Sequence, residues 1–356
     1  MQKIMFMIPQ LFGGGAERVT AVLANELCKN NEVSIVVYKR GNNDYSIDER
    51  IKIYDMESQL TGSGHDVFAK MKALKRIIKN TDPVCVISLA GPGAAVLLAV
   101  LMVGMKTKLI LSERNDPKNF PKEKFLRVLR RIAYELCDGV VFQTKEAKNF
   151  FSKRIKRKSC VIKNPVLCEL PNRFEGEREH KIVNWCRLNE QKNLDLLIEA
   201  FSDVEKEFPE YTLEIYGEGP ERERLADKIK KLGLDKKVFL CGHSDKVHEK
   251  VYKAALFVSS SDFEGISNSM LEAMAMGIPC VCTDCPAGGA RETIENKVNG
   301  ILVSVGNREC MADAIRCVLG DKNTAENLSK EGEKLRKEIE AEFIAEQWMK
   351  FALELL

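Results

Sequence analysis

The chain has 356 residues, of which 45% are hydrophobic and 30% charged, and its formal net charge is +3. This length exceeds what one hydrophobic core usually serves, so we expect two domains in a soluble globular protein. The twelve cysteines are scattered without a paired framework, which argues against a disulfide-stabilised secreted protein and for reduced thiols in the cytoplasm.

The small net charge hides an asymmetry between the two halves. Residues 1–170 hold 29 basic and 17 acidic residues, a net charge of +12, whereas residues 171–356 hold 26 and 35, a net charge of −9. A basic half joined to an acidic half suggests that one domain faces an anionic partner. The apolar run after Lys3 meets Pro9 too soon for an export signal, so we expect no signal peptide.

Strand-like runs rich in valine and isoleucine alternate with helical patterns along the chain. In the first half we expect strands near 3–8, 32–38, 51–56, 84–89, 108–113, 139–144 and 159–164. In the second half we expect them near 181–187, 211–218, 237–242, 255–261, 278–284 and 299–304. Helical spacing is found at 16–30, 69–80, 122–136, 193–207 and 220–232. Two such series predict an α/β protein with two Rossmann-like, doubly wound domains and parallel sheets.

Three segments bear on the domain boundaries and on membrane insertion. The run from Asn164 through His180, with its prolines and charges, marks the expected join, and the amphipathic stretch Ala341–Leu356 could pack on either domain. The uncharged stretch Val86–Met105 is long enough for a membrane span, but Gly91-Pro92-Gly93 interrupts it. We therefore expect a buried strand followed by a short apolar helix.

Two carboxylates stand eight residues apart in the run Phe263–Pro279. We expect Glu264 in a glycine-containing loop and Glu272 in the helix that the loop opens, so that both border a helix N-terminus suited to a phosphate. A structural alternative is a capping box from Ser269 to Glu272, in which the glutamate satisfies only a terminal amide.

Glycines and cations follow other predicted strands. The first strand runs into Gly13-Gly14-Gly15, which lets the backbone approach an anion, although it matches neither the dinucleotide pattern nor a P-loop. A plain tight turn is the alternative there, as it is for the turn Tyr216–Pro220. Arg187 and Lys192 follow the first strand of the second half and could offset a diphosphate; a solvated surface pair is the alternative.

The ordered set of these motifs resembles glycosyltransferase family 4. It consists of R-x4-K (Arg187, Lys192), Y-G-E-G-P (216–220), and E-x7-E (Glu264, Glu272) followed by A-M-A-M-G-I-P (273–279). The similarity covers nearly the whole chain and is strongest over Val251–Val303. The segment Cys285–Glu292 is similar to members that build bacterial surface polysaccharides.

The resemblance implies a retaining, metal-independent enzyme of the GT-B type, with two Rossmann-like domains facing each other across a cleft and no cofactor besides its nucleotide-sugar substrate. It implies an acceptor-binding domain at 1–168, a nucleotide-sugar-binding domain at 169–340 and a helix at 341–356 that crosses back to the first domain. Retention would proceed by front-face attack within an ion pair, with a phosphate oxygen accepting the acceptor's proton.

The resemblance also assigns roles to individual residues. Arg187 and Lys192 would hold the donor diphosphate, Glu264 would contact the donor sugar near the reacting centre, and Glu272 would accept from the ribose hydroxyls. Backbone amides around Ser267, Asn268 and Ser269 would support the phosphates and the sugar. Gly14 and Gly15 would close over the diphosphate from the opposite domain.

The chain departs from the family pattern at two places. Cys186 stands where the family often has glycine before the diphosphate arginine. Arg114 stands where many members place a histidine near the donor sugar, and we expect it, with Glu113, to line the sugar or acceptor pocket and alter selectivity.

Histidines and cysteines provide weaker candidates. Cys280, Cys282 and Cys285 could suggest a metal site, but no second ligand pair has suitable spacing, so buried thiols are expected and no metal is predicted. His243 and His248 flank a strand-to-helix loop, where a peripheral or base-adjacent role is expected.

The segment 122–132 places apolar residues at helical spacing with cations opposite, and the segment 153–158 adds a second basic cluster. These clusters favour an anionic lipid surface, with a solvated helix as the alternative. They lack interleaved aromatic residues, so we do not expect a nucleic-acid partner.

These observations predict a cytoplasmic enzyme, peripheral on the inner face of the cell membrane. It would transfer a sugar from a UDP-linked donor to a polyprenyl-diphosphate-linked glycan. The alternatives are a soluble transferase that makes a small glycoside and a nucleotide-sugar-binding subunit without turnover. A nicotinamide dehydrogenase is disfavoured because the glycine loop lacks the dinucleotide spacing.

Overall fold

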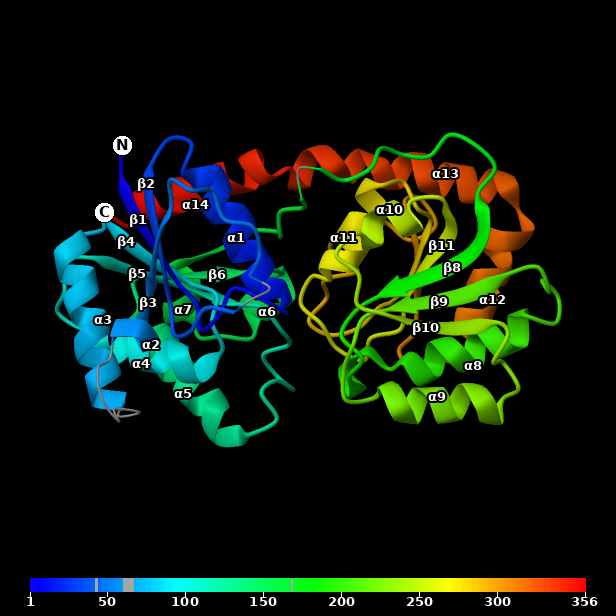
Figure 1. Ribbon diagram of the computed structural model, residues 1–356, viewed down its shortest axis with the longest axis horizontal. Helices are drawn as coiled ribbons and strands as arrows, with labels where there is room; N and C mark the ends of the chain where they lie inside the picture. The colour runs from blue at the N-terminus through cyan, green and yellow to red at the C-terminus, as the bar shows by residue number, and fades with distance from the viewer. Residues whose placement is uncertain (42–43, 60–66, 168) are drawn as a thin grey trace. The chain divides into compact units, whose positions relative to one another are not determined.

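The computed structural model describes residues 1–41, 44–59, 67–167 and 169–356. The chain forms two compact units, of which the first comprises Met1–Pro165 and Ile339–Leu356 and the second comprises Val166–Glu338 (Figure 1). The last helix of the chain therefore belongs to the unit that contains the N-terminus.

The first unit is built on a seven-stranded parallel sheet with the order β3-β2-β1-β4-β5-β6-β7. Its strands are β1 (Lys3–Met7), β2 (Glu32–Val37), β3 (Lys52–Asp55), β4 (Cys85–Ser88), β5 (Lys108–Glu113), β6 (Gly139–Phe142) and β7 (Ser159–Val161). Its helices are α1 (Gly15–Leu27), α2 (Met56–Gln59), α3 (Val67–Thr81), α4 (Pro92–Met102), α5 (Lys124–Leu136), α6 (Lys145–Asn149), α7 (Lys153–Arg157) and α14 (Ala341–Glu354).

The second unit is built on a six-stranded parallel sheet with the order β10-β9-β8-β11-β12-β13. Its strands are β8 (Glu179–Trp185), β9 (Thr212–Tyr216), β10 (Val238–Gly242), β11 (Ala254–Ser259), β12 (Cys280–Thr283) and β13 (Ile301–Val303). Its helices are α8 (Leu194–Val204), α9 (Arg222–Lys231), α10 (Val247–Val251), α11 (Asn268–Ala275), α12 (Arg308–Gly320) and α13 (Lys322–Glu333). The short helices η1 (Glu190–Lys192) and η2 (Lys334–Ile339) follow β8 and α13.

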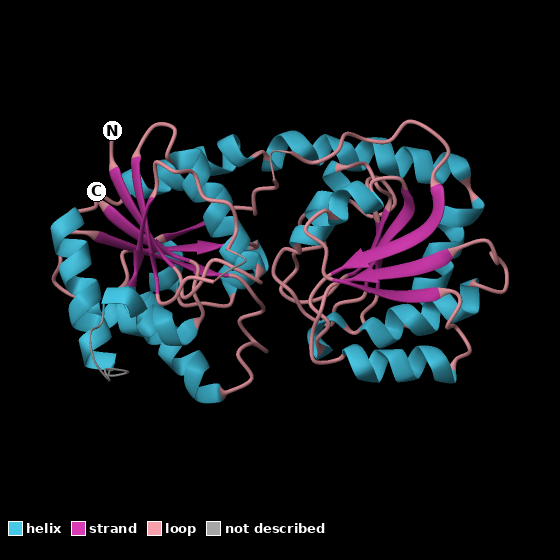
Figure 2. Ribbon diagram, viewed as in Figure 1, coloured by secondary structure: helices cyan, strands magenta, loops and turns pink. Residues whose placement is uncertain are grey.

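Continuous apolar runs explain why both sheets are parallel and covered. Every residue of β4, β6, β11 and β12 is buried, as expected for strands that pack helices on both faces. Helices lie on both sides of each sheet (Figure 2). The predicted strands and the doubly wound fold class are confirmed, with strand ends that differ from the expected ones by a few residues.

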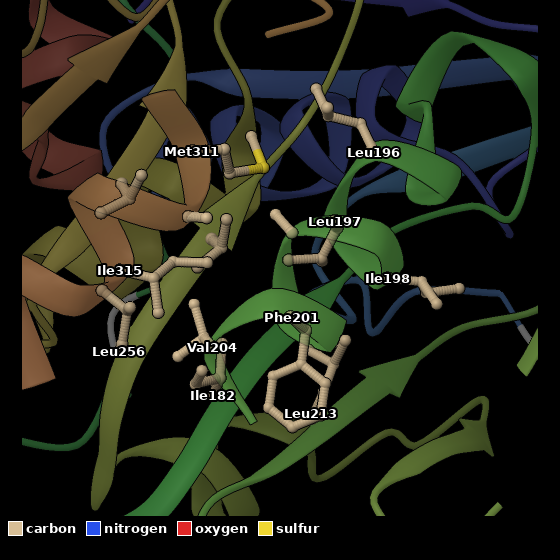
Figure 3. Close-up of a cluster of buried hydrophobic side chains, with 14 of the residues drawn as sticks. Ile182, Leu196, Leu197, Ile198, Phe201, Val204, Leu213, Leu256, Met311 and Ile315 are labelled. Carbon is tan, nitrogen blue, oxygen red and sulfur yellow. The ribbon is translucent and has the colours of Figure 1, made fainter. Parts of the chain in front are cut away.

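The core of the second unit lies between its sheet and the amphipathic helices α8 and α12. Leu197, Phe201 and Val204 from α8 meet Ile182 of β8, and Met311 and Ile315 of α12 lie in the same cluster (Figure 3). All of these side chains are buried, so the packing of α8 fixes the start of that helix next to the end of β8.

Helix α14 packs into the core of the first unit. Trp348 and Ile344 belong to the same buried cluster as residues of α1 and the sheet. Gly139 begins β6 without a side chain, and a Cβ there would lie 2.6 Å from Leu355 Cδ1 and 3.0 Å from the Phe351 ring. The glycine therefore makes room for the end of α14.

The stretch Val86–Met105 does not form one long helix. It contains most of β4 and then α4, which begins at Pro92 after Gly91, as the glycine–proline break predicts. Across the described parts of the chain, every helix is too short or too polar to cross a membrane.

Two glycines let the loop after β9 lie directly against the loop after β8. The backbone amide of Leu188 donates to the Glu218 carbonyl at 3.0 Å, and the amide of Glu221 donates to the Leu188 carbonyl at 3.1 Å. A Cβ at Gly217 would lie 1.9 Å from the Cys186 carbonyl oxygen, and one at Gly219 would lie 2.1 Å from the Leu188 carbonyl oxygen. Only residues without side chains permit this approach.

We expect Gly219→Ala to lower the thermal midpoint of unfolding by about 4 °C or more, because the backbone must shift at a cost of about 2 kcal/mol. Gly93→Ala is the matched control, since a Cβ there meets nothing within 4 Å, and its midpoint should stay within about 1 °C of the wild type. Differential scanning calorimetry measures both. Equal midpoints for the two variants would contradict the assigned close approach.

Candidate functional site

The candidate site of the second unit lies where the order of its strands reverses. β8 and β11 are neighbours, and the chain leaves β8 towards β9 on one side and leaves β11 towards β12 on the other. Ligands of open α/β sheets bind at the carboxyl ends of strands at such a switch point. The loops that follow these two strands carry Arg187 and Lys192 after β8 and Glu264 after β11.

Side-chain hydrogen bonds fasten these two loops to each other. Asn193 caps α8 with φ 41° and ψ 52°, in the left-handed region that asparagine tolerates, and its Nδ2 donates to Asp262 Oδ1 at 2.7 Å. Gln191 Nε2 donates to the Phe263 carbonyl at 2.8 Å, and the Asp262 amide donates to the Gln191 carbonyl at 2.9 Å. The two loops therefore act as one rigid support for the residues they carry.

Lys192 and Glu264 form an ion pair on this support. Lys192 Nζ lies 2.5 Å and 2.7 Å from the two carboxylate oxygens of Glu264, and Ser261 Oγ donates to Oε2 at 2.9 Å. Burial lowers the pKa of Lys192, but the nearby Glu264 carboxylate outweighs this effect, so the pKa lies above its usual value. The ammonium thus keeps its proton at neutral pH, and the pair is electrically neutral.

Helix α11 begins shortly after Glu264. Its N-cap is Ser267, whose Oγ accepts from the Met270 amide at 3.4 Å and lies 3.0 Å from Ser269 Oγ. The capping-box alternative placed the cap at Ser269, and that placement is wrong because the helix already begins at Asn268. Ser267, Asn268 and Ser269 thus form the N-terminus of a buried helix, the end that favours anions.

Glu272 lies inside α11 with 1% of its surface exposed. Its Oε2 accepts from Trp185 Nε1 at 3.0 Å and lies 2.9 Å from His248 Nε2. Trp185 is the last residue of β8, so this carboxylate also sits at the carboxyl end of that strand. Trp185 was not selected from the sequence, and His248 was expected only to be peripheral or base-adjacent.

Arg187 is exposed and follows β8 directly after Cys186. Within residues 1–41, 44–59, 67–167 and 169–356, its guanidinium forms no ion pair and no hydrogen bond. Cys186 stands where the family often has glycine. It keeps the backbone hydrogen bonding of this segment, because its amide donates to the Tyr216 carbonyl at 3.0 Å. The charge of Arg187 is therefore available to an anionic ligand.

The glycine loop of the first unit follows β1, and the order of the first sheet reverses between β1 and β4. Gly13 has φ 78°, which favours glycine, and Gly14 is the N-cap of α1 without a side-chain cap. Tyr45 Oη donates to the Gly14 carbonyl at 3.2 Å. Gly14 and Gly15 thus lie at a helix N-terminus at the switch point of their own sheet.

Glu113 ends β5 and is buried with Arg130. Arg130 Nη1 lies 3.0 Å from Glu113 Oε2, and the Arg130 side chain also donates to the Phe120 and Pro117 carbonyls at 2.6 Å and 2.5 Å. Burial raises the pKa of Glu113 even though Arg130 opposes this rise. These contacts hold the loop between β5 and α5, so they give no support to the predicted pocket role of Glu113. Arg130 was expected on the cationic face of the helix but is only 2% exposed.

Arg114 lies partly buried at the end of the same strand. Its Nη2 donates to Asn164 Oδ1 at 2.5 Å, and Asn164 Oδ1 also accepts from Gln143 Nε2 at 2.7 Å. Burial lowers the pKa of Arg114 to about 9. A cation whose side-chain hydrogen bonds go to a neutral amide and a hydroxyl is costly to bury, which is typical of a residue that meets a polar ligand.

Cys280 and Cys282 are buried in β12, and Cys285 is buried just beyond it. Burial raises the pKa of Cys285 to about 12, so its thiol is protonated and poorly nucleophilic at neutral pH. In the described part of the chain, no three histidine, cysteine or acidic side chains are grouped so that they could hold a metal ion.

Comparisons with known proteins cover both units. The family model for Glycosyltransferase Family 4 matches residues 13–170, and the model for Glycosyl transferases group 1 matches residues 171–335.

Two curated relatives match over nearly their whole length. A Campylobacter jejuni alpha-1,4-N-acetyl-D-galactosaminyltransferase, named for a GalNAc-containing diNAcBac-PP-undecaprenol acceptor, is 29% identical over 100% of this chain and 99% of its own. The amylovoran biosynthesis glycosyltransferase AmsD of Erwinia amylovora is 24% identical over 98% and 99%.

Two solved structures share the fold at low sequence identity. TarM, known from S. aureus, has a TM-score of 0.83 at 17% identity over 99% of both chains. HepE of Anabaena, in complex with UDP, has a TM-score of 0.80 at 17% identity over 99% of this chain and 100% of its own.

The two family models, one for each half, agree with the order of motifs and with the two doubly wound sheets. The chain belongs to the glycosyltransferases that join a Family 4 N-terminal half to a group 1 C-terminal half in the GT-B fold.

Proposed function

We propose that this glycosyltransferase moves a sugar from a UDP-linked donor to a polyprenyl-diphosphate-linked glycan, with retention of configuration and without a metal ion. The observation that carries the proposal is the set of charges at the ends of β8 and β11. Arg187, which has no ion-pair partner among the described residues, lies there together with the Lys192–Glu264 ion pair and the N-terminus of α11.

As the bond to the sugar breaks, negative charge develops on the diphosphate leaving group. Positive charge beside the diphosphate therefore stabilises it more as the leaving group departs. Arg187 supplies a full charge with donors in a fixed fork, which suits phosphate oxygens. The Lys192 ammonium has three N–H donors, so it can donate to a phosphate oxygen while it still contacts Glu264. The backbone amides of Ser267, Asn268 and Ser269 add oriented dipoles. Together these groups can replace a divalent cation at the leaving group.

Glu264 and Glu272 take different parts in the reaction. The ion pair holds the Glu264 carboxylate near the N-terminus of α11, where it can accept from a hydroxyl of the donor sugar close to the breaking bond. Glu272 is deeper and lies against Trp185, where it can accept from ribose hydroxyls. The predicted role of Gly14 and Gly15 at the diphosphate stays a prediction.

The acceptor is inferred from the relatives' names. Two Campylobacter jejuni enzymes that match this chain over at least 94% of its length are named for undecaprenyl-diphosphate-linked substrates. A lipid-linked acceptor requires the enzyme to work at a membrane surface. That requirement separates the proposal from its alternative, a soluble transferase that makes a small glycoside.

The surface of α5 suits an anionic membrane. Phe125, Val128, Ile132 and Leu136 recur at helical spacing and are 68%, 57%, 44% and 47% exposed. Lys124 and Arg131 are exposed on the same helix. An amphipathic helix with exposed apolar residues and flanking cations binds at the lipid interface. We therefore propose peripheral attachment to the cytoplasmic face of the membrane through the first unit.

We expect Glu264→Gln to lower kcat by more than about tenfold, because the neutral amide loses the charge that Lys192 and the sugar hydroxyl share. Donor turnover with a panel of nucleotide sugars and a lipid-linked acceptor measures this effect. Glu309→Gln, at an exposed position of α12, is the matched control and should keep the wild-type rate. A wild-type rate in Glu264→Gln would refute the assignment, and absence of turnover by the wild type with every donor would favour a non-catalytic subunit.

We expect Arg114→His to change the ratio of kcat/KM between competing nucleotide sugars by about tenfold, since one polar contact to a sugar carries that much discrimination. Arg157→His, at an exposed position of α7, is the control. A donor screen measures both variants. Unchanged preference and rate in Arg114→His would assign Arg114 to the structural cluster around Asn164 alone.

We expect Val128→Glu to weaken binding to anionic vesicles by roughly tenfold, because it removes an apolar contact with the bilayer and adds a repelled charge. Val305→Glu, which alters a valine of 39% exposure in the second unit, should bind like the wild type. Vesicle flotation measures the bound fraction. Wild-type protein that stays at the bottom of the gradient would contradict membrane attachment and favour the soluble alternative.

A further inference from the structure

Two side chains that the proposed chemistry does not use converge on one oxygen of Glu272. Trp185 Nε1 donates to Oε2 at 3.0 Å, and His248 Nε2 lies 2.9 Å from the same oxygen. They come from the end of β8 and from α10, whereas Glu272 comes from α11. An ionised carboxylate can only accept, so the His248 contact requires a proton on Nε2.

Packing holds both donors in place. The Trp185 side chain is buried, and its ring lies 4.7 Å from that of Phe257 in β11 at an interplanar angle of 64°. The His248 ring meets the Trp185 ring edge-on, at 6.2 Å and 89°. The indole and imidazole therefore have little freedom, and the carboxylate oxygen that they share is fixed with them.

This arrangement offsets the cost of burying the charge of Glu272. A carboxylate taken out of water is destabilised unless hydrogen-bond donors replace the water. A carboxylate can accept about four hydrogen bonds, so hydroxyls of a ligand can share it with protein donors. The two donors thus help to fix the orientation of the carboxylate that a ligand's hydroxyls would meet.

We propose that Trp185 and His248 are positioning residues that orient the Glu272 carboxylate towards the ribose hydroxyls of the nucleotide and so determine how strongly those hydroxyls contribute to binding. This inference rests on the proposed function, which assigns Glu272 to the ribose. It adds that the preference for a ribonucleotide depends on two residues that act through their contacts with Glu272.

The test compares UDP with 2′,3′-dideoxyuridine diphosphate by isothermal titration calorimetry on the full chain. We expect Trp185→Phe and His248→Leu to weaken UDP binding by about tenfold, as the loss of a charge-assisted hydrogen bond would. Binding of the dideoxy nucleotide should change less than twofold. His248→Gln, whose amide can replace the Nε2 donor, should regain most of the UDP affinity.

The chain offers a matched control for each substitution. Trp348 is also buried, but its indole N–H has no acceptor among the described residues, so Trp348→Phe removes a tryptophan without breaking a hydrogen bond. His243 is exposed and lies 3.0 Å from Asp245, so His243→Leu removes a histidine away from Glu272. Both controls should bind the two nucleotides as the wild type does.

The outcomes separate the inference from the function on which it rests. A wild type that prefers UDP over the dideoxy nucleotide, with Trp185→Phe and His248→Leu unchanged, would overturn the positioning role alone. Equal losses for both nucleotides would also overturn it, because a general loss of structure does not depend on the hydroxyls. A wild type that binds neither nucleotide would overturn the proposed function and this inference together. If Trp185→Phe does not fold, the contrast between His248→Leu and His248→Gln decides.

Discussion

The ion pair between Lys192 and Glu264 is the interaction on which the candidate site depends. It joins the loop after β8 to the loop after β11 and places the Glu264 carboxylate near the N-terminus of α11. Their side chains are 15% and 18% exposed, so neither charge would be well solvated alone. Removing either partner would leave the other uncompensated, and the two residues therefore act as a unit.

In the proposed function, the pair also determines which group attracts the diphosphate. Because Lys192 is neutralised by Glu264, the net positive charge beside β8 is that of Arg187, supported by the dipole of α11. A diphosphate that draws Lys192 towards itself would weaken the hold on Glu264 and leave that carboxylate readier to accept from a sugar hydroxyl. Donor binding and the orientation of the reacting sugar would then be coupled through one ammonium group.

Much of the scaffold could be predicted from the sequence, because a buried parallel strand is an uninterrupted apolar run and its helices carry a clear amphipathic period. This is why the strands near 84–89 and 255–261 were located within a few residues and why Gly91-Pro92 correctly argued against a membrane span. The order of the strands, and with it the switch point, is given by the structure, and it brings Lys192 and Glu264 together although 72 positions separate them in the chain.

The sequence was less informative where long-range packing decides the role of a polar residue. Arg130 lies in a run of surface-like cations, and only the fold shows that it turns inward to Glu113. Trp185 reads as one more apolar residue of a strand, and nothing near it in the chain signals that its N–H meets Glu272. The N-cap of α11 is Ser267 and not Ser269. Several adjacent polar residues could cap this helix, and the local sequence pattern alone does not decide among them.

The central claim is that protein cations and amide dipoles neutralise the donor diphosphate without a divalent ion. The dissociation constant of UDP, measured by calorimetry in excess chelator and again with millimolar Mg²⁺, tests it most directly. Neutralisation by Arg187, Lys192 and the α11 N-terminus predicts the same affinity in both buffers and a loss of about tenfold or more in Arg187→Gln. Binding that appears only with Mg²⁺, or that is unchanged in Arg187→Gln, would contradict it.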